Sequence, residues 1–215
     1  MNENAFPEEY FRRADESPDG NFYLAPRFVA HIDSETIEAL TRFYREFVPL
    51  KADVLDLMSS WISHLPEDRT LGRVAGLGMN QEELAGNTRL TEYVVHDLNR
   101  DPVLPYTPVS FDRVIISVSI QYLVNPVQVL RSVRSIIRPA GQVAIAMSHR
   151  CFPTKAIAAF HTLSPKERVE LVSAFLFEAG FEGIRFVDQS PATGDPLWIL
   201  IGTAPSASND GNAFS

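Results

Sequence analysis

Short apolar runs typical of β-strands alternate with segments of helical periodicity along most of this chain. The apolar runs cover residues 52–58, 73–79, 92–98, 111–120 and 141–148. A parallel sheet has both faces buried under helices, so its strands read as nearly continuous apolar runs. This alternation predicts an α/β fold with a mostly parallel sheet and helices on both faces.

The segments between the strands carry signals for helix boundaries. Asp33 or Ser34 can cap a helix that ends before Pro49, and Ser164 with Glu167 has the spacing of a capping box. We expect further helices near residues 60–65, at about 81–85, from about 126 to 137, and from 164 until Gly180. The last two strands, 182–189 and 196–204, are too close for a parallel crossover, which predicts a C-terminal antiparallel hairpin.

Length and charge limit the function classes. With 215 residues the chain is long enough for one substantial core, and we expect a single domain over 34–204. We expect residues 1–33 to be an N-terminal extension, partly mobile, that can cover an active site, and residues 205–215 to be a disordered tail. The net charge of −8 gives no electrostatic reason to bind nucleic acid or an anionic membrane, so a small organic partner is expected.

Cysteine and hydropathy indicate the compartment. A single cysteine, Cys151, excludes an internal disulfide, and the first residues carry acids without a long apolar stretch. We therefore expect a cytoplasmic protein without a signal peptide or a membrane anchor. The sequence does not indicate an oligomeric state.

The middle of the chain resembles a known family. The segment FDRVIISVSIQYLVNPVQVLRSVRSIIRPAGQVAIAMS is similar to the fourth strand, fourth helix and fifth strand of the class I, Rossmann-like S-adenosylmethionine (SAM) methyltransferases of the small-molecule type 11 group. VLDL resembles the first strand of that family, VAGLGMNQEEL the second strand with its helix, and VVHDLNRDPVLPY the third strand with its loop. The resemblance covers roughly residues 50 to 204, and it implies a Rossmann-like seven-stranded sheet.

Two positions depart from the family pattern. After Asp56 the family has glycines that pass beneath the methionine part of SAM, whereas this chain continues with Met58, Ser59, Ser60 and Trp61. At the end of the second strand the family has an acid that binds the ribose, and this chain has Gly78, which would open space. Asn80, Glu82, Ser59 and Ser60 are the nearest replacements.

The resemblance nevertheless implies a cofactor site. Asp97 matches the residue that accepts from the adenine amino group, and Asp56 would orient the methionine end. The cofactor-binding candidates are Asp56, Met58, Ser59, Ser60, Gly78, Met79, Asn80, Asp97, Leu98 and Ser117, with SAM as the cofactor. Trp61 is expected to fill core volume or to lie beside the sulfonium.

Other residues are candidates for the acceptor and for catalysis. The loop after the fifth strand carries His149, Arg150, Cys151 and Lys155 at the carboxyl edge of the sheet, where open α/β folds bind ligands. The substrate-binding candidates are Tyr23, Arg27, Gln121, Tyr122 and Arg150, and the catalytic candidates are His149, Cys151 and His31. The histidines lack a metal-ligand spacing, so no metal site is predicted.

Three hypotheses follow from the sequence. The first is a SAM-dependent methyltransferase that acts on a small-molecule acceptor by in-line transfer. The second is a catalytically inactive binding or regulatory protein that keeps the fold. The third is another cofactor or reaction on the same scaffold, because a fold does not fix a function.

Overall fold

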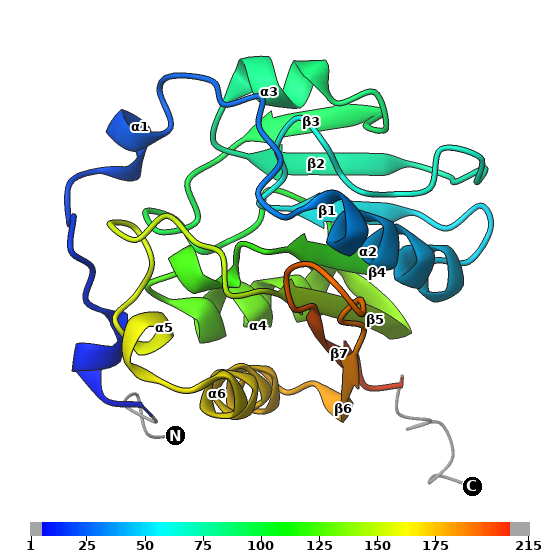
Figure 1. Cartoon of the computed structure of the whole chain (residues 1–215). Helices are drawn as coiled ribbons and strands as arrows, with labels where there is room; N and C mark the ends of the chain where they lie inside the picture. Colours follow the sequence, from blue (N-terminus) through cyan, green and yellow to red (C-terminus); the bar gives the residue numbers. More distant parts are fainter. Residues whose placement is uncertain (1–5, 207–215) are drawn as a thin grey trace, which may run out of the picture.

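The structure is a computed structural model that describes residues 6–206. At its centre lies a seven-stranded sheet with the order β3-β2-β1-β4-β5-β7-β6 (Figure 1). The strands are β1 (Val54–Leu57), β2 (Val74–Gly78), β3 (Glu92–Val95), β4 (Phe111–Ser117), β5 (Ile137–Met147), β6 (Glu182–Asp188) and β7 (Trp198–Thr203). The strands from β3 to β5 pair in parallel, and β7 pairs antiparallel with both β5 and β6. The predicted Rossmann-like sheet with its C-terminal hairpin is confirmed.

Helices lie on both faces of this sheet. They are α1 (Asp19–Phe22), α2 (Ser34–Phe47), α3 (Gln81–Gly86), α4 (Pro126–Ile136), α5 (Ala159–Thr162) and α6 (Pro165–Glu178), with 3-10 turns η1 (Glu8–Phe11) and η2 (Ile120–Tyr122). Tyr44 and Phe47 of α2 belong to a core on one face of the sheet. Val133 of α4 and Phe175 of α6 belong to the core on the other face. Alternation along β1 serves both cores, because Val54 points to the first and Leu55 to the second.

Local hydrogen bonds explain the predicted helix starts. The Asp33 carboxylate accepts from the Thr36 backbone N–H at 2.9 Å, and Ser164 with Glu167 forms the predicted capping box. Asn80 caps α3 by accepting from two backbone N–H groups. These contacts join residues two or three positions apart, so a sequence pattern is enough to find them.

The expected helix near residues 60–65 is wrong. Residues 58–73 form a loop between β1 and β2. The hydroxyls of Ser59 and Ser63 bind the buried Asp56 carboxylate, and Pro66 directly follows the stretch that was expected to be helical. The side-chain contacts of this loop therefore override the helical pattern, which is short in any case.

The N-terminal segment, residues 6–33, crosses one end of the sheet and packs against the domain. Phe6 contacts Phe175 of α6 with ring centroids 4.9 Å apart, and the Ala158 N–H donates to the Arg12 carbonyl at 2.8 Å. The segments expected to be mobile or disordered were 1–33 and 205–215, of which residues 1–5 and 207–215 lie outside the described residues. The helices of the described part are all too short or too polar to cross a bilayer.

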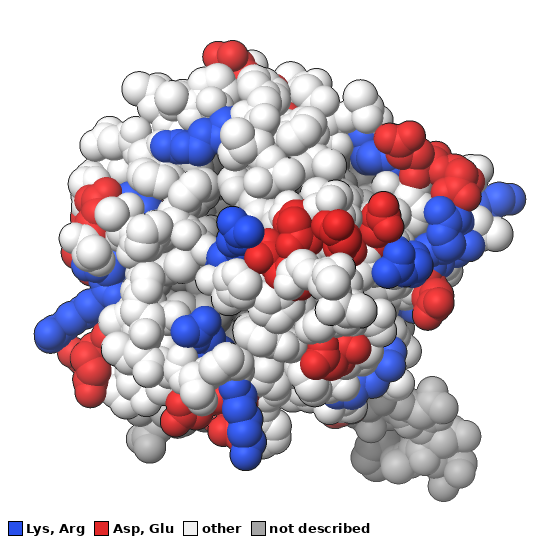
Figure 2. Space-filling model, viewed as in Figure 1, with Lys and Arg blue, Asp and Glu red and all other residues white. Residues whose placement is uncertain are grey.

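Acidic and basic side chains are interspersed on the face shown in Figure 2. A group of acidic side chains lies near the middle of this view, and the basic side chains form no continuous patch there. This distribution agrees with the net charge of −8 and gives no electrostatic footprint for nucleic acid on that face.

Candidate functional site

A cleft opens at the carboxyl ends of the parallel strands, next to the neighbouring strands β1 and β4, where the strand order reverses. Its walls come from the ends of β1, β2, β3 and β4, and its fourth side comes from the N-terminal segment through Asp19, Tyr23, Arg27 and His31. This is the position at which open α/β sheets bind ligands.

Asp56 of β1 is buried at the base of the cleft. The side chains of Ser59 and Ser63 each donate to the same carboxylate oxygen at 2.6 Å, and the Asn87 amide donates to the Ser63 hydroxyl at 2.9 Å. Burial raises the pKa of the Asp56 carboxyl to about 7, although both hydroxyl contacts act to lower it. This carboxyl therefore titrates near neutral pH.

The turn after β1 is made without glycine. Met58 has a φ of +60°, in the left-handed region that usually requires glycine, and Val118 after β4 has a φ of +50°. Both residues line the cleft. Strained backbone of this kind is characteristic of ligand sites, and here it lies at the ends of two adjacent strands.

Gly78 is required by the protein chain itself rather than by open space. A Cβ at this position would collide with the backbone carbonyl of Ser59. The expectation that Gly78 opens room for a ligand is therefore wrong, because the backbone of Ser59 occupies the space that a Cβ would take. Gly78 still lines the cleft. The missing side chain lets the glycine-free loop approach β2, where the Ser59 N–H donates to the Leu77 carbonyl at 2.8 Å.

The predicted replacements for the ribose-binding acid have different positions. Asn80 lines the cleft, but its amide donates to the carbonyls of Tyr23 and Leu24, and its oxygen caps α3. Glu82 lies outside the lining, whereas Glu83 is buried within it. The Glu83 carboxylate accepts from the Ser60 hydroxyl at 2.5 Å and from the Arg27 backbone N–H at 2.6 Å.

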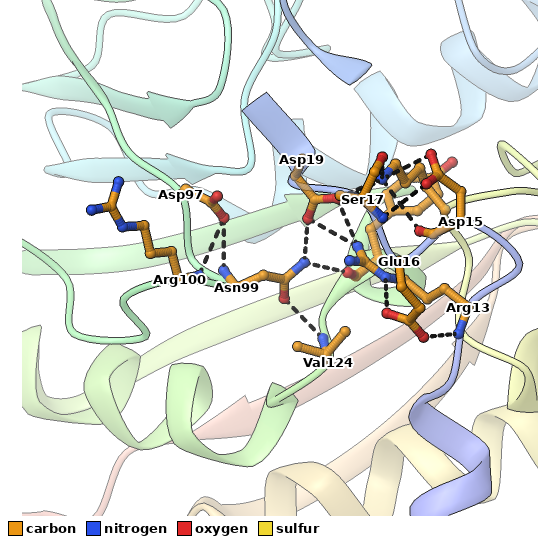
Figure 3. Close-up of polar contacts among 11 residues, drawn as sticks. Arg13, Asp15, Glu16, Ser17, Asp19, Asp97, Asn99, Arg100 and Val124 are labelled. Carbon is orange, nitrogen blue, oxygen red and sulfur yellow. Dashed lines mark hydrogen bonds and ion pairs between the residues drawn. The ribbon is translucent and has the colours of Figure 1, made fainter. Parts of the chain in front are cut away.

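Asp97, after β3, lines the cleft as predicted. One of its oxygens accepts from the backbone N–H groups of Asn99 and Arg100, and its other oxygen has no partner among the contacts of the described residues (Figure 3). The Asn99 amide donates to Asp19 at 2.7 Å and to the Tyr122 carbonyl at 2.8 Å. The loop after β3 is thereby linked to the N-terminal segment.

Asp19 belongs to a buried ionic cluster that sequence reasoning missed. Arg13 donates to both of its oxygens, at 2.8 and 2.9 Å, and the Lys155 ammonium lies 3.2 Å from one of them (Figure 3 shows the arrangement around Asp19). Burial alone would raise the pKa of the Asp19 carboxyl, but hydrogen bonds from Asn99 and Arg13 outweigh it and lower the pKa. No sequence pattern signals this cluster, because Lys155 comes from the loop after β5.

Two further polar atoms in the cleft lack partners. His64 Nδ1 and Ser119 Oγ are buried and make no hydrogen bond to any residue in 6–206. Burial lowers the pKa of His64 to about 4, so its ring is neutral at physiological pH. Buried polar atoms are rarely left unpaired, so we expect an ordered water or a ligand to complete these two. Neither residue stands in a recognisable motif.

An aromatic wall closes the side of the cleft next to β4. Phe152, Tyr122, Tyr23 and His31 line it, and the Tyr122 hydroxyl accepts from the Phe152 backbone N–H at 2.8 Å. Burial lowers the pKa of His31, which keeps its imidazole neutral at neutral pH. Tyr23, Arg27, His31 and Tyr122 are thus brought together as predicted.

The remaining candidates of the loop after β5 are not at the cleft. His149 Nε2 and Arg150 Nε each lie 3.0 Å from the Asp195 carboxylate, outside the lining. Gln121 is buried and donates to the Val118 carbonyl. Burial raises the pKa of the Cys151 thiol, which is the opposite of nucleophile activation. The structure therefore does not bring His149, Cys151, Gln121 or Arg150 into the lining of the cleft.

Trp61 is also misplaced by the sequence prediction. Its indole N–H donates to the Val29 carbonyl at 3.0 Å, and its ring packs against the exposed Phe28 with centroids 6.2 Å apart. It therefore holds the N-terminal segment at the surface and does not fill the core. The cleft-lining residues of this loop are Met58, Ser59, Ser60, Ile62 and His64.

The sheet order and the cleft define a Rossmann-like nucleotide-binding fold of the methyltransferase type. A family model described as "Methyltransferase domain" matches residues 60–145, beginning just after the glycine-free turn. The match covers less than half of the chain, and the sheet order is that of the Rossmann-like methyltransferase fold. No curated protein matches the sequence.

Several solved structures share this fold at low sequence identity. A chain from the complex between the Haloferax volcanii Trm112 methyltransferase activator and a methyltransferase is 15% identical, with a TM-score of 0.61, over 84% of this chain and 93% of that one. Haemonchus contortus phosphoethanolamine N-methyltransferase 2, in complex with SAM, is 16% identical with a TM-score of 0.58, over 79% of this chain and 53% of that one. The [4+2]-cyclase SpnF is 15% identical with a TM-score of 0.60, over 78% and 81%.

Proposed function

We propose that this protein is a SAM-dependent methyltransferase that acts on a small-molecule acceptor by in-line methyl transfer. The observation that supports this most is the pair of buried, unpartnered polar atoms, His64 Nδ1 and Ser119 Oγ, in a cleft at the switch point of a methyltransferase fold.

The residues present fit SAM despite the missing glycines. The free oxygen of Asp97 can accept from an adenine amino group, and Asp56 can accept from an ammonium group at the base of the cleft. Ser119 Oγ and His64 Nδ1 offer polar atoms that have no partner within residues 6–206. A cationic ligand group next to Asp56 would favour its ionised form and lower its pKa from about 7.

When bound, SAM supplies a methyl group on a sulfonium, which an acceptor atom displaces in line. The chain contributes positioning and exclusion of water: the N-terminal segment forms one wall of the cleft, and the aromatic wall around Phe152 holds the acceptor. His31 is the histidine of this wall, and its neutral imidazole can accept the proton that an O–H or N–H acceptor releases.

Calorimetry with SAM and S-adenosylhomocysteine tests the proposal. We expect saturable binding and thermal stabilisation by the ligand. Asp97→Ala should weaken binding by about 1–3 kcal/mol, the value of a lost hydrogen bond to a charged group. Asp97→Asn should bind with intermediate affinity, because its side-chain oxygen still accepts from the loop.

Asp101→Ala is the matched control. Asp101 lies in the same loop, is exposed and accepts from one backbone N–H, that of Val103, but it does not line the cleft. It should leave the affinity unchanged. Absence of saturable binding to the wild-type protein would reject the proposal and favour an inactive protein that keeps the fold. The feature that favours that alternative is the loop 58–73, which lies between β1 and β2 where a helix was expected.

A further inference from the structure

The aromatic wall of the cleft is organised around one ring, that of Phe152. Its centroid lies 5.2 Å from Phe22, 5.2 Å from His31 and 5.8 Å from Tyr122. Phe22 and His31 come from the N-terminal segment, Tyr122 follows β4, and Phe152 follows β5. Three separate parts of the chain therefore meet to form an apolar surface that suits a flat ring.

Arg27 stands beside this surface with its cationic group unpaired. Its guanidinium carbon lies 4.2 Å from the Phe22 centroid and 5.6 Å from that of Phe152. Among the described residues, the guanidinium makes one hydrogen bond, a long one of 3.4 Å to the Ala25 carbonyl, and no carboxylate approaches it within 4.0 Å. Stacking covers the face of a guanidinium and leaves the N–H donors at its edge free for a ligand.

The backbone of Arg27 is nevertheless held in place. Its N–H donates to the buried Glu83 carboxylate at 2.6 Å. Arg13 of the same segment is different, because both oxygens of Asp19 occupy its guanidinium. In the N-terminal segment, the Arg13 guanidinium is therefore paired with Asp19. Arg27 is held by its backbone N–H, and its guanidinium has no carboxylate partner among the described residues.

The charge around the cleft limits what Arg27 can bind. Four carboxyl side chains line the cleft, those of Asp19, Asp56, Glu83 and Asp97, and Arg27 is the single lysine or arginine within the lining. A dianion such as a phosphate monoester would be repelled more strongly by these carboxylates than a monoanion would be. A planar carboxylate also matches the two-pronged donor geometry of a guanidinium.

We propose that the acceptor is an aromatic or heteroaromatic carboxylic acid. Its ring packs against Phe152, and its carboxylate pairs with the guanidinium of Arg27. This inference rests on the proposed function in that the acceptor occupies the same cleft as SAM, and it adds the chemical class of the substrate.

Binding of four small probes tests the class. The probes are 4-hydroxybenzoate, its neutral counterpart 4-hydroxybenzyl alcohol, the non-aromatic cyclohexanecarboxylate and the dianion phenyl phosphate. Dissociation constants are measured near neutral pH by calorimetry or ligand-observed NMR, with and without S-adenosylhomocysteine. The proteins are the wild type, Arg27→Ala, Arg27→Lys, Phe152→Leu and the control Arg42→Ala. Arg42 lies on α2, 64% exposed, and its removal changes the net charge equally.

We expect 4-hydroxybenzoate to bind at least about 10-fold more tightly than the alcohol, the value of one charge-assisted pair. Arg27→Ala should abolish this preference, Arg27→Lys should retain part of it, and Arg42→Ala should keep it. Phe152→Leu should weaken both aromatic probes about 2- to 10-fold and bring their affinities toward that of cyclohexanecarboxylate.

The inference is overturned if the alcohol binds as tightly as the acid, if Arg27→Ala behaves as Arg42→Ala does, or if phenyl phosphate binds best. If the wild type binds S-adenosylhomocysteine but none of the acids, the substrate class is wrong and the methyltransferase proposal stands. If it binds no S-adenosylhomocysteine but keeps an Arg27-dependent preference for the acid, the methyltransferase proposal fails and the anion site stands.

Discussion

Two buried ionisable side chains beside the cleft have opposite surroundings. Lys155, which is fully buried, has carboxylates at 3.0 Å (Asp15) and 3.2 Å (Asp19) and donates to the Ser17 carbonyl at 2.7 Å. Asp56, 2% exposed, is contacted by the hydroxyls of Ser59 and Ser63 and by no cation among the described residues. The charge of Lys155 is balanced by carboxylates of the N-terminal segment, which this ion pair holds in place. The Asp56 carboxyl has no positively charged partner among the described residues.

This difference separates structural from functional burial of charge. A buried ion pair with its hydrogen bonds complete serves the fold, and breaking it leaves an uncompensated charge. A buried carboxyl without a cation has a raised pKa, and a positively charged ligand group would relieve its unfavourable environment. The comparison therefore assigns Lys155 to the support of the cleft and Asp56 to its binding surface.

Removal of Lys155 should have the largest effect. Lys155→Ala leaves Asp15 without its ammonium partner and takes one of the two cations from Asp19, which keeps Arg13 and the Asn99 amide, so we expect the free energy of unfolding to fall by about 3–5 kcal/mol. Chemical denaturation measures this. Lys166→Ala, at an exposed i,i+4 pair on α6, should change it by less than about 0.5 kcal/mol.

Lys155→Met refines this test, because methionine fills the buried stem without a charge. A loss as large as that of Lys155→Ala would attribute the effect to the ammonium, and a much smaller loss to packing. Equal stabilities of Lys155→Ala and Lys166→Ala would contradict the support role.

Asp56 should produce a pH dependence of moderate size. Its pKa is raised from 3.8 to about 7 in the folded protein, so between these pH values the folded state keeps a proton that the unfolded state has released. Its ionisation therefore lowers stability as the pH rises from about 4 to 7. Asp56→Asn removes this contribution and should be more stable than the wild type at pH 8 by on the order of 2–4 kcal/mol.

The difference between Asp56→Asn and the wild type should shrink as the pH falls toward 4, which urea denaturation at several pH values can measure. Asp188→Asn on the exposed edge of β6 is the control, and it should follow the wild-type slope. A constant difference at every pH would show that Asp56 does not titrate in this range.

The glycine-free turn should give the smallest effect. At Met58, φ is +60°, which costs a non-glycine residue about 1–2 kcal/mol, so Met58→Gly relieves strain while it loses side-chain packing. We expect the net change in unfolding free energy to stay within about 1 kcal/mol.

Met79→Gly is the matched control, since Met79 also lines the cleft and is half-buried but has no positive φ. It should cost about 1 kcal/mol more than Met58→Gly. Thermal unfolding of the two variants decides this. Equal losses would mean that the turn after β1 is unstrained.

Much of the fold was predictable because its signals are local. The cap at Asp33, the capping box of Ser164 and Glu167, and the C-terminal hairpin each depend on residues that are close in sequence. The positions of Asp56 and Asp97 in the cleft also followed from the sequence, because both follow or end predicted parallel strands. The expected helix near residues 60–65 failed because side-chain contacts to Asp56 and Glu83 decide the course of that loop.

The candidate site was predicted in part. Tyr23, Arg27, His31 and Tyr122 meet at the cleft, but His149 and Arg150 are bound to Asp195 from the β6–β7 connection. The residues that reach the cleft and those that do not both include a histidine and an arginine, so residue type does not distinguish them. Which side chains face the ligand depends on partners from distant parts of the chain, and no local pattern encodes that choice.

The sequence by itself determined the alternation of strands and helices, the helix caps and the edge of the sheet at which a ligand binds, because hydrogen bonds between near neighbours and apolar periodicity are properties of short segments. Only the tertiary structure decided which charges are compensated. The Lys155 ammonium meets Asp19 through the packing of two remote segments, and the Asp56 carboxyl titrates near neutrality because folding removes it from water without supplying a cation.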